Sequence, residues 1–248
     1  IGEQCRRIGV HINFAPVIDV NNNPLNPVIG MRSFGENPES VAKKGYFYMN
    51  GLQDENVLAS AKHFPGHGDT EVDSHEDLPV LTKSKKELHA IELVPFQFLI
   101  DNGVASVMVA HLTVPAYDKQ SKRPASLSSS LIEKQLKQKM GFEGLVITDG
   151  LDMQGVTKYY KKGEIALEAF QAGNDILLIP DDIPFSIQLM EEALVKGKLS
   201  RERLEESCKK ILRYKYLSGA WKREIVDTDN LLIDLNKTEY IDLQEKLF

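Results

Sequence analysis

The sequence predicts an α/β fold, a (β/α)8 barrel of the TIM type, of which five βα units are visible in this chain. Short apolar runs rich in valine and isoleucine alternate with longer segments of helical period. These runs are apolar on both faces, which indicates a parallel sheet covered by helices. Polar residues stand where nearly every run ends, as in a barrel, whereas an open doubly wound sheet usually carries a glycine-rich phosphate loop, and no such motif is present.

The elements follow in order along the chain. The predicted strands are 12–20, 57–64, 105–111, 144–149 and 175–180. Between them, the S-x-x-E sequences at 84–87 and 130–133 predict helix starts closed by capping boxes, and Gly103 and Gly141 are expected to end helices. A final amphipathic helix is predicted over 200–219, with an apolar side formed by Leu204, Ile211 and Leu212.

The domain organisation follows from these elements. Residues 1–219 are expected to hold the C-terminal five βα units of the barrel, and the opening IGEQCRRIGV is typical of the end of a helix that feeds a strand. The remainder of the barrel is therefore expected upstream. Residues 220–248 lack a strand pattern and are rich in polar residues, which predicts a linker or the start of a following domain.

The composition of the chain argues against several classes of protein. The chain has 248 residues, is 42% hydrophobic and has a formal charge of −6 without a long basic run, which excludes a disordered chain and argues against a nucleic-acid binder. No apolar run reaches the roughly 20 residues of a membrane span. Cys5 and Cys208 are far apart without a C-x-x-C motif, so a cysteine-ligated zinc site is not expected.

Residues 62–75, KHFPGHGDTEVDSH, concentrate the polar chemistry of the chain. Its histidines and acidic residues are possible metal ligands, but the helical H-E-x-x-H spacing is absent and the glycines predict an irregular loop. The same groups are suited to moving a proton, to holding a sugar, or only to stiffening a loop through mutual hydrogen bonds. The residues alone leave these alternatives open.

Six stretches in order resemble the barrel of glycoside hydrolase family 3, in its β-N-acetylglucosaminidase (β-N-acetylhexosaminidase) branch. The most specific is KHFPGHG followed by D-S-H. The matching stretches are residues 12–38, 61–81, 107–118, 124–132, 141–156 and 172–180.

The resemblance implies a retaining hydrolase that removes β-linked N-acetylglucosamine from amino-sugar glycans such as peptidoglycan fragments. It implies a small carbohydrate substrate and a further domain downstream, as in many members, and we expect no cofactor and no metal. The compartment stays open, and analogy with two-domain members favours a periplasmic or extracellular bacterial location. The alternatives are a family-3 β-glucosidase or β-xylosidase, a barrel metallohydrolase, and a non-catalytic sugar-binding module. Whether phosphate can replace water as the acceptor stays open.

Asp149, at the end of GLVITD, matches the nucleophile of the family. Retaining hydrolysis needs a carboxylate on one face of the anomeric carbon and a proton donor on the other. Without the resemblance, Asp149 would be interpreted as a helix N-cap. The family often has a second acid directly after the nucleophile, whereas this chain has Gly150 there and Asp152 two places further on.

Asp73 and His75 match the unusual acid/base pair of this branch, in which histidine replaces the second carboxylate. Histidine titrates near neutral pH, so His75 is able to protonate the departing oxygen and later to deprotonate water. Asp73 would orient the ring. Without a functional role, His75 would be interpreted as a solvated loop histidine.

By the same resemblance, Arg32, Lys62 and His63 hold the sugar. Without a functional role, Arg32 and Lys62 would be interpreted as surface charges and His63 as a core imidazole. Asp19 and His111 also stand at strand ends, and we expect them to support the site or to lie at its rim.

Overall fold

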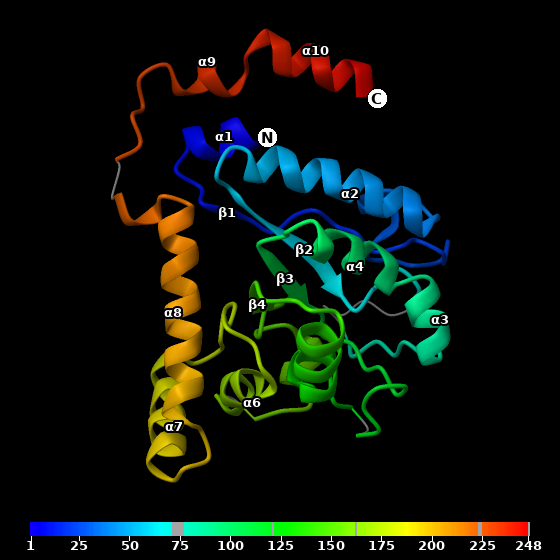
Figure 1. Ribbon diagram of the computed structural model, residues 1–248, viewed down its shortest axis with the longest axis vertical. Coiled ribbons are helices and arrows are strands. Elements are labelled where there is room, and N and C mark those ends of the chain that lie inside the picture. Colours follow the sequence, from blue (N-terminus) through cyan, green and yellow to red (C-terminus); the bar gives the residue numbers. More distant parts are fainter. Residues whose placement is uncertain (71–76, 121, 162, 223–224, 248) are drawn as a thin grey trace.

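A computed structural model describes residues 1–70, 77–120, 122–161, 163–222 and 225–247. Its centre is a sheet of parallel strands in the order β1-β2-β3-β4 (Figure 1). The strands are β1 (Ile12–Asn13), β2 (Leu58–Phe64), β3 (Ser106–Val109) and β4 (Leu145–Thr148). Each new strand lies beside the previous one in chain order, with helical segments between them, which is the pattern of a barrel. The predicted fold class is confirmed, and the described residues form part of such a barrel.

Helices surround the strands. The α-helices are α1 (Gly2–Arg7), α2 (Pro38–Gln53), α3 (Lys85–Ala90), α4 (Leu93–Asp101), α5 (Gln154–Thr157), α6 (Glu164–Ala172), α7 (Ile183–Val195), α8 (Arg201–Leu217), α9 (Leu231–Leu235) and α10 (Thr238–Leu247). Short 3-10 turns are η1 (Gly30–Arg32), η2 (Ala125–Leu127) and η4 (Ala220–Lys222), and η3 (Ser130–Lys139) is π-helical. None of the helices within the described ranges is long and apolar enough to cross a bilayer.

The main core lies between the strands and helices α2 and α4, which lie alongside β2 and β3 (Figure 1). Met49 of α2 and Leu99 of α4 are fully buried in it. Phe64 of β2 meets Phe96 of α4 edge to face, with ring centroids 5.3 Å apart. This packing fixes the C-terminal end of β2 against the helix layer.

Local sequence signals account for several element ends. Ser84 and Glu87 form the predicted capping box at the start of α3. Gly103 and Gly141 have φ values of 83° and 72° just after α4 and η3, so the predicted helix ends are confirmed. These left-handed conformations favour glycine because it has no Cβ.

The second predicted capping box is wrong. The helix over Ser130–Lys139 has Ser129 as its N-cap, without a side-chain capping bond. Glu133 instead accepts a hydrogen bond from Lys137 at 2.7 Å, one turn further on. The opposite charge forward in the helix competes successfully with the reverse bond that a capping box needs.

The first and fifth predicted strands are shorter than expected. In the first, only Ile12–Asn13 is a strand, because Pro16 has no amide hydrogen to donate, and pairing resumes as a single bridge between Val17 and Lys62. In 175–180, only Ile176 pairs with the sheet, through a bridge to Ile147. Ile179 has a φ of 46°, which is incompatible with an extended strand.

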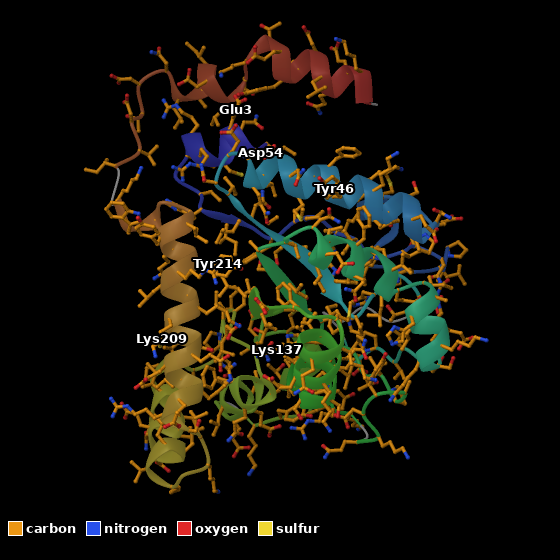
Figure 2. The ribbon with its side chains drawn as sticks, in the orientation of Figure 1. Glu3, Tyr46, Asp54, Lys137, Lys209 and Tyr214 are labelled. Atoms are coloured by element: carbon orange, nitrogen blue, oxygen red, sulfur yellow. The ribbon has the colours of Figure 1, made fainter. Side chains whose placement is uncertain are left out.

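Helix α8 packs along the sheet, as Figure 2 shows for Tyr214, which points toward the strands while Lys209 points away. Leu204 and Ile211 contact apolar clusters, as predicted. Leu212 is 64% exposed, so its predicted place on the apolar side is wrong. Adjacent helical residues point about 100° apart, and Ile211 takes the inward direction.

An ion-pair cluster connects α8 to the start of the 175–180 segment. The Asp175 carboxylate, with its side chain fully buried, lies 3.0 Å from Lys210 Nζ and 3.4 Å from Arg203 Nη1. It also accepts hydrogen bonds from Ser207 Oγ at 2.6 Å and from the Val146 amide at 3.0 Å. These interactions outweigh the cost of burial, and they lower the pKa of Asp175.

Helices α9 and α10 lie on the side of α1 away from the strands (Figure 1). Arg7 of α1 forms a 2.7 Å ion pair with Asp234 of α9, and the Gln4 side chain donates to the Leu235 carbonyl at 2.8 Å. The assignment of residues 220–248 to a linker or to the start of a following domain stays a prediction.

Candidate active site

The polar residues that end the strands meet at one edge of the sheet. Lys62 and His63 lie near the end of β2, His111 two residues after β3, and Asp149 directly after β4. Carboxyl ends of parallel strands share an edge, which is where barrels carry their sites. Of the predicted site residues, the structure brings together Asp149, Lys62, His63 and Arg32. Asp73 and His75 lie outside the described residues.

Asp19 organises the base of this edge. Its buried carboxylate accepts hydrogen bonds from the His63 and His67 amides, at 3.1 Å and 2.7 Å to Oδ1. Its Oδ2 lies 2.7 Å from His63 Nδ1. Burial raises the pKa of Asp19, but the interactions with His63 and His67 outweigh this effect and hold the pKa below its ordinary value. Asp19 is therefore an ionised anchor for the loop that follows β2.

The same contacts determine how His63 is oriented. An ionised carboxylate only accepts hydrogen bonds, so His63 Nδ1 carries the hydrogen that faces Asp19. Its Nε2 lies 3.5 Å from Nη2 of the exposed Arg32. The imidazole is thereby held between an anion and a cation, with Nε2 as the acceptor. His63 is mostly buried, at 6% exposed, which agrees with both the sugar-binding and the core interpretations.

Asp149 is partly buried at the end of β4. Its amide donates to the Val109 carbonyl at 2.9 Å, and its Oδ1 accepts from the Gly150 amide at 2.9 Å. Burial raises the pKa of Asp149, but His63, His111, the Gly150 amide and Lys62 together lower it below the ordinary range. Asp149 thus presents an ionised carboxylate, the form that a nucleophile or a stabiliser of positive charge requires.

Lys62 supplies a partly desolvated cation next to this carboxylate. Burial and the nearby Arg32 charge lower the pKa of Lys62, while Asp149 and Asp19 raise it in opposition. Lys62 therefore lies within electrostatic reach of one further cation, Arg32, and of two carboxylates, Asp149 and Asp19. Such an arrangement offers donors for the hydroxyl groups of a sugar beside a carboxylate able to react.

The sequence patterns did not predict three residues that support the loop after β2, namely Asn26, Lys83 and Glu92. Asn26 donates to the His67 and Thr70 carbonyls at 2.7 Å and 2.9 Å. Glu92, whose pKa is raised by burial, accepts from Lys83 at 2.5 Å, and Lys83 also pairs with Asp69 at 3.0 Å. Asn26 stands between two prolines in NPLNP, a composition typical of a side chain that bonds to nearby backbone. No comparable signal indicates Glu92.

The loop after β2 also depends on close backbone approach. A Cβ atom at Gly68 would lie 2.0 Å from the Val20 carbonyl oxygen. Only glycine fits at this position. With respect to metals, no group of three or more His, Cys, Asp or Glu side chains suited to a metal ion occurs among the residues that the structure describes.

Comparison with known proteins identifies relatives of this arrangement. The family model described as the glycosyl hydrolase family 3 N terminal domain matches residues 1–214. Beta-hexosaminidase A of Pseudoalteromonas piscicida is 37% identical over 234 residues, which cover 87% of this chain and 39% of that protein. The chain spans 39–56% of the length of the first curated relatives that it matches.

Solved structures also superpose on most of this chain. A glycoside hydrolase family 3 beta-N-acetylglucosaminidase from Paenibacillus sp. str. FPU-7 superposes with a TM-score of 0.86 at 38% identity, covering 94% of this chain and 46% of that one. A structure named beta-glucoside phosphorylase BglX superposes with a TM-score of 0.90 at 27% identity, covering 97% and 45%.

Proposed function

The chain belongs to glycosyl hydrolase family 3, and from this membership we propose that the whole protein is a retaining β-N-acetylhexosaminidase with Asp149 as its nucleophile. The observation that carries the proposal is the ionised Asp149 carboxylate at the end of β4, which shares its sheet edge with Lys62 and His63. The relatives named as hexosaminidases support the choice of an N-acetylated sugar.

The reaction has two steps. In the first, an oxygen of Asp149 bonds to the anomeric carbon while the bond from that carbon to the leaving oxygen breaks, and His75 gives the leaving oxygen its proton. In the second, water attacks the anomeric carbon, His75 takes the proton of the water, and the Asp149 carboxylate is released. Two inversions give net retention. Asp73 holds the His75 ring and stabilises its positive charge.

The sugar is held by the cationic side of the site. Lys62 and Arg32 donate hydrogen bonds to hydroxyl oxygens, and His63 presents Nε2 with its ring fixed by Asp19. These groups bind the glycone and leave its anomeric carbon facing Asp149. For substrate, we propose amino-sugar glycans such as peptidoglycan fragments, since such polymers expose β-linked N-acetylglucosamine.

The test uses the natural full-length protein with aryl N-acetyl-β-glucosaminide and aryl β-glucoside, each with and without added phosphate. We expect preference for the N-acetylated substrate and a β-configured first product. Asp149→Asn should lower turnover by at least about 1,000-fold, because it removes the nucleophile and leaves the fold unchanged. Asp54→Asn is the matched control, since Asp54 is exposed at the end of α2, far from β4 (Figure 2).

The outcomes separate the alternatives. Near-normal turnover by Asp149→Asn would remove Asp149 from the mechanism. A preference for the β-glucoside would favour the β-glucosidase alternative, a possibility that the Cellulomonas fimi relative named beta-N-acetylglucosaminidase/beta-glucosidase, 31% identical, makes concrete. A sugar phosphate formed in the phosphate arm would identify phosphorolysis.

A further inference from the structure

His111 is fully buried against the backbone of the residue that follows Asp149, and it lies two residues after the end of β3. Both of its ring nitrogens have partners within the protein. Nε2 lies 2.9 Å from the Gly150 carbonyl oxygen, and Nδ1 lies 2.7 Å from Ser126 Oγ. The imidazole therefore bridges η2 and the loop that follows β4.

The partners determine where the proton sits. A carbonyl oxygen only accepts, so Nε2 carries the hydrogen and donates it to Gly150. Burial lowers the pKa of His111, against the opposing effect of the Asp149 charge, and keeps the ring neutral. Nδ1 then has a lone pair that accepts the Ser126 hydroxyl hydrogen. Neither nitrogen is left to contact a sugar or to move a proton.

The backbone of Gly150 connects the His111 imidazole to the Asp149 carboxylate. The Gly150 amide donates to Asp149 Oδ1 at 2.9 Å, and the Gly150 carbonyl accepts from His111. Two successive backbone groups at one residue are thus tied, one to the carboxylate and one to the buried ring. The Gly150 carbonyl belongs to the 150–151 peptide, whose Leu151 amide donates to the Leu178 carbonyl at 2.9 Å. With both polar groups of that planar peptide bonded, the Gly150 backbone has less freedom to turn the amide that holds Oδ1.

Ser126 is itself rigid. Its amide donates to the Ala110 carbonyl at 3.2 Å, and its carbonyl accepts from the Asn174 side chain at 2.8 Å. The hydroxyl is therefore presented to His111 from a fixed backbone. A continuous path leads from η2 through Ser126, His111 and Gly150 to the Asp149 carboxylate.

We propose that His111, in the tautomer selected by the Gly150 carbonyl and completed by the Ser126 hydroxyl, is a positioning residue that sets the direction of the Asp149 carboxylate. The inference rests on the proposed role of Asp149 as the nucleophile. A misdirected carboxylate impairs attack on the anomeric carbon but leaves the sugar contacts of Lys62 and His63 in place. The loss of His111 should therefore lower kcat and leave KM nearly unchanged.

Two substitutions in the natural full-length protein separate the two nitrogen contacts. The amide of His111→Gln reaches the position of Nε2 and retains a donor for Gly150, whereas His111→Asn is one carbon shorter and reaches only toward Ser126. We expect kcat to fall by about 100-fold in His111→Asn and by about 10-fold or less in His111→Gln, with KM within about twofold. Ser126→Ala should lower kcat by about fivefold to tenfold because it leaves Nδ1 without its partner and loosens the ring.

The matched control is Ser106→Ala. Ser106 begins β3 at the opposite edge of the sheet, where its buried hydroxyl donates to the Ala59 carbonyl at 2.8 Å. It removes the same atom at a similar cost in stability and should leave kcat unchanged. Two further measurements do not depend on stability: the pH profile of His111→Asn should keep its shape, and NMR of the imidazole nitrogens should show hydrogen on Nε2.

Each outcome decides the inference. An unimpaired His111→Asn, a change in KM alone, equal losses in the Asn and Gln variants, or hydrogen on Nδ1 would overturn it. The loss of one limb of the pH profile would make His111 a proton-transfer residue instead. Wild-type turnover with an active Asp149→Asn variant, or no turnover at all, would overturn the proposed function, and this inference with it.

Discussion

Asp19 is the side chain on which the loop after β2 most depends, and its removal tests that dependence. In Asp19→Ala, the amides of His63 and His67 and the Nδ1–H group of His63 lose their common acceptor. In Asp19→Asn, the amide oxygen at the Oδ1 position still accepts from both backbone amides. The amide nitrogen at the Oδ2 position faces His63 Nδ1 as a donor.

The structure gives the size of the effect. A hydrogen bond to a charged partner contributes about 1.5–3 kcal/mol, and three are lost in Asp19→Ala. Relaxation of the loop recovers part of this, so we expect a decrease of about 3–5 kcal/mol in the free energy of unfolding. Asp19→Asn keeps two bonds but loses the charge, which roughly halves their strength, so we expect a decrease of about 1–2 kcal/mol.

The Asn variant should also change His63. Because the new side-chain NH2 group donates to Nδ1, the imidazole hydrogen should move to Nε2, where it faces the Arg32 guanidinium. Activity on the N-acetylated aryl substrate should then fall more than stability does. Chemical denaturation, NMR of the imidazole nitrogens and turnover measure the three effects, with Asp54→Asn as the control.

The pH dependence provides an independent check. The pKa of Asp19 is lowered in the fold, so its charge stabilises the protein above the unfolded pKa of about 3.9 and this contribution disappears as pH falls through the folded pKa. The stability difference between wild type and Asp19→Asn should be greatest near neutral pH and should shrink under acidic conditions. Variants within about 0.5 kcal/mol of wild type at neutral pH would refute this account of the loop.

Four further predictions concern the proton donor, a buried ion-pair cluster, a close backbone approach and the metal alternative. His75→Ala should impair substrates with poor leaving groups most, and azide should restore turnover of an activated substrate with a β-linked azide product; equal losses without rescue would demote His75 to sugar binding. Asp175→Ala should cost about 3–5 kcal/mol in denaturant unfolding because it leaves two cations without their buried partner, whereas Glu205→Ala, at an exposed ion pair, should cost less than about 1 kcal/mol. Gly68→Ala should lower the melting temperature and the activity together, because the added Cβ meets a backbone carbonyl, while Gly51→Ala in open space within α2 should stabilise by about 0.5–1 kcal/mol. Prolonged chelation should leave turnover unchanged, and a loss that zinc restores would favour the metallohydrolase alternative.

The periodicity of apolar residues in the sequence was sufficient to predict the sheet and most of the helices around it. Buried parallel strands need apolar residues on both faces, and amphipathic helices need one apolar side, so both patterns are visible without knowledge of contacts. The pattern failed where backbone chemistry competed with it. Pro16 and the left-handed Ile179 interrupt runs that are apolar enough to be strands, and Leu212 follows the residue that takes the inward direction.

The residues of the candidate site were likewise predictable only in part. The pattern of strand ends placed Asp149, Lys62 and His63 at the active edge of a barrel. Their proposed roles, and the choice of Arg32, Asp73 and His75, came from the family resemblance. Two of these, Asp73 and His75, lie outside the described residues, so their pairing stays a prediction. No local pattern predicts which buried group each of the others contacts.

What the sequence by itself determined was therefore the class of fold, the family and the residue types at the strand ends, since these depend on local pattern and motif. Only the tertiary structure decided the supporting contacts. Asp19 lies 44 residues before His63, and Ser126 lies 15 residues after His111. These hydrogen bonds, together with that from His111 to the Gly150 carbonyl, fix the orientations and tautomers of the two imidazoles. They depend on acceptors and donors brought together by packing and not by sequence spacing. The charge states of Asp19 and Asp149 follow for the same reason, because burial and neighbouring charges exist only in the folded chain.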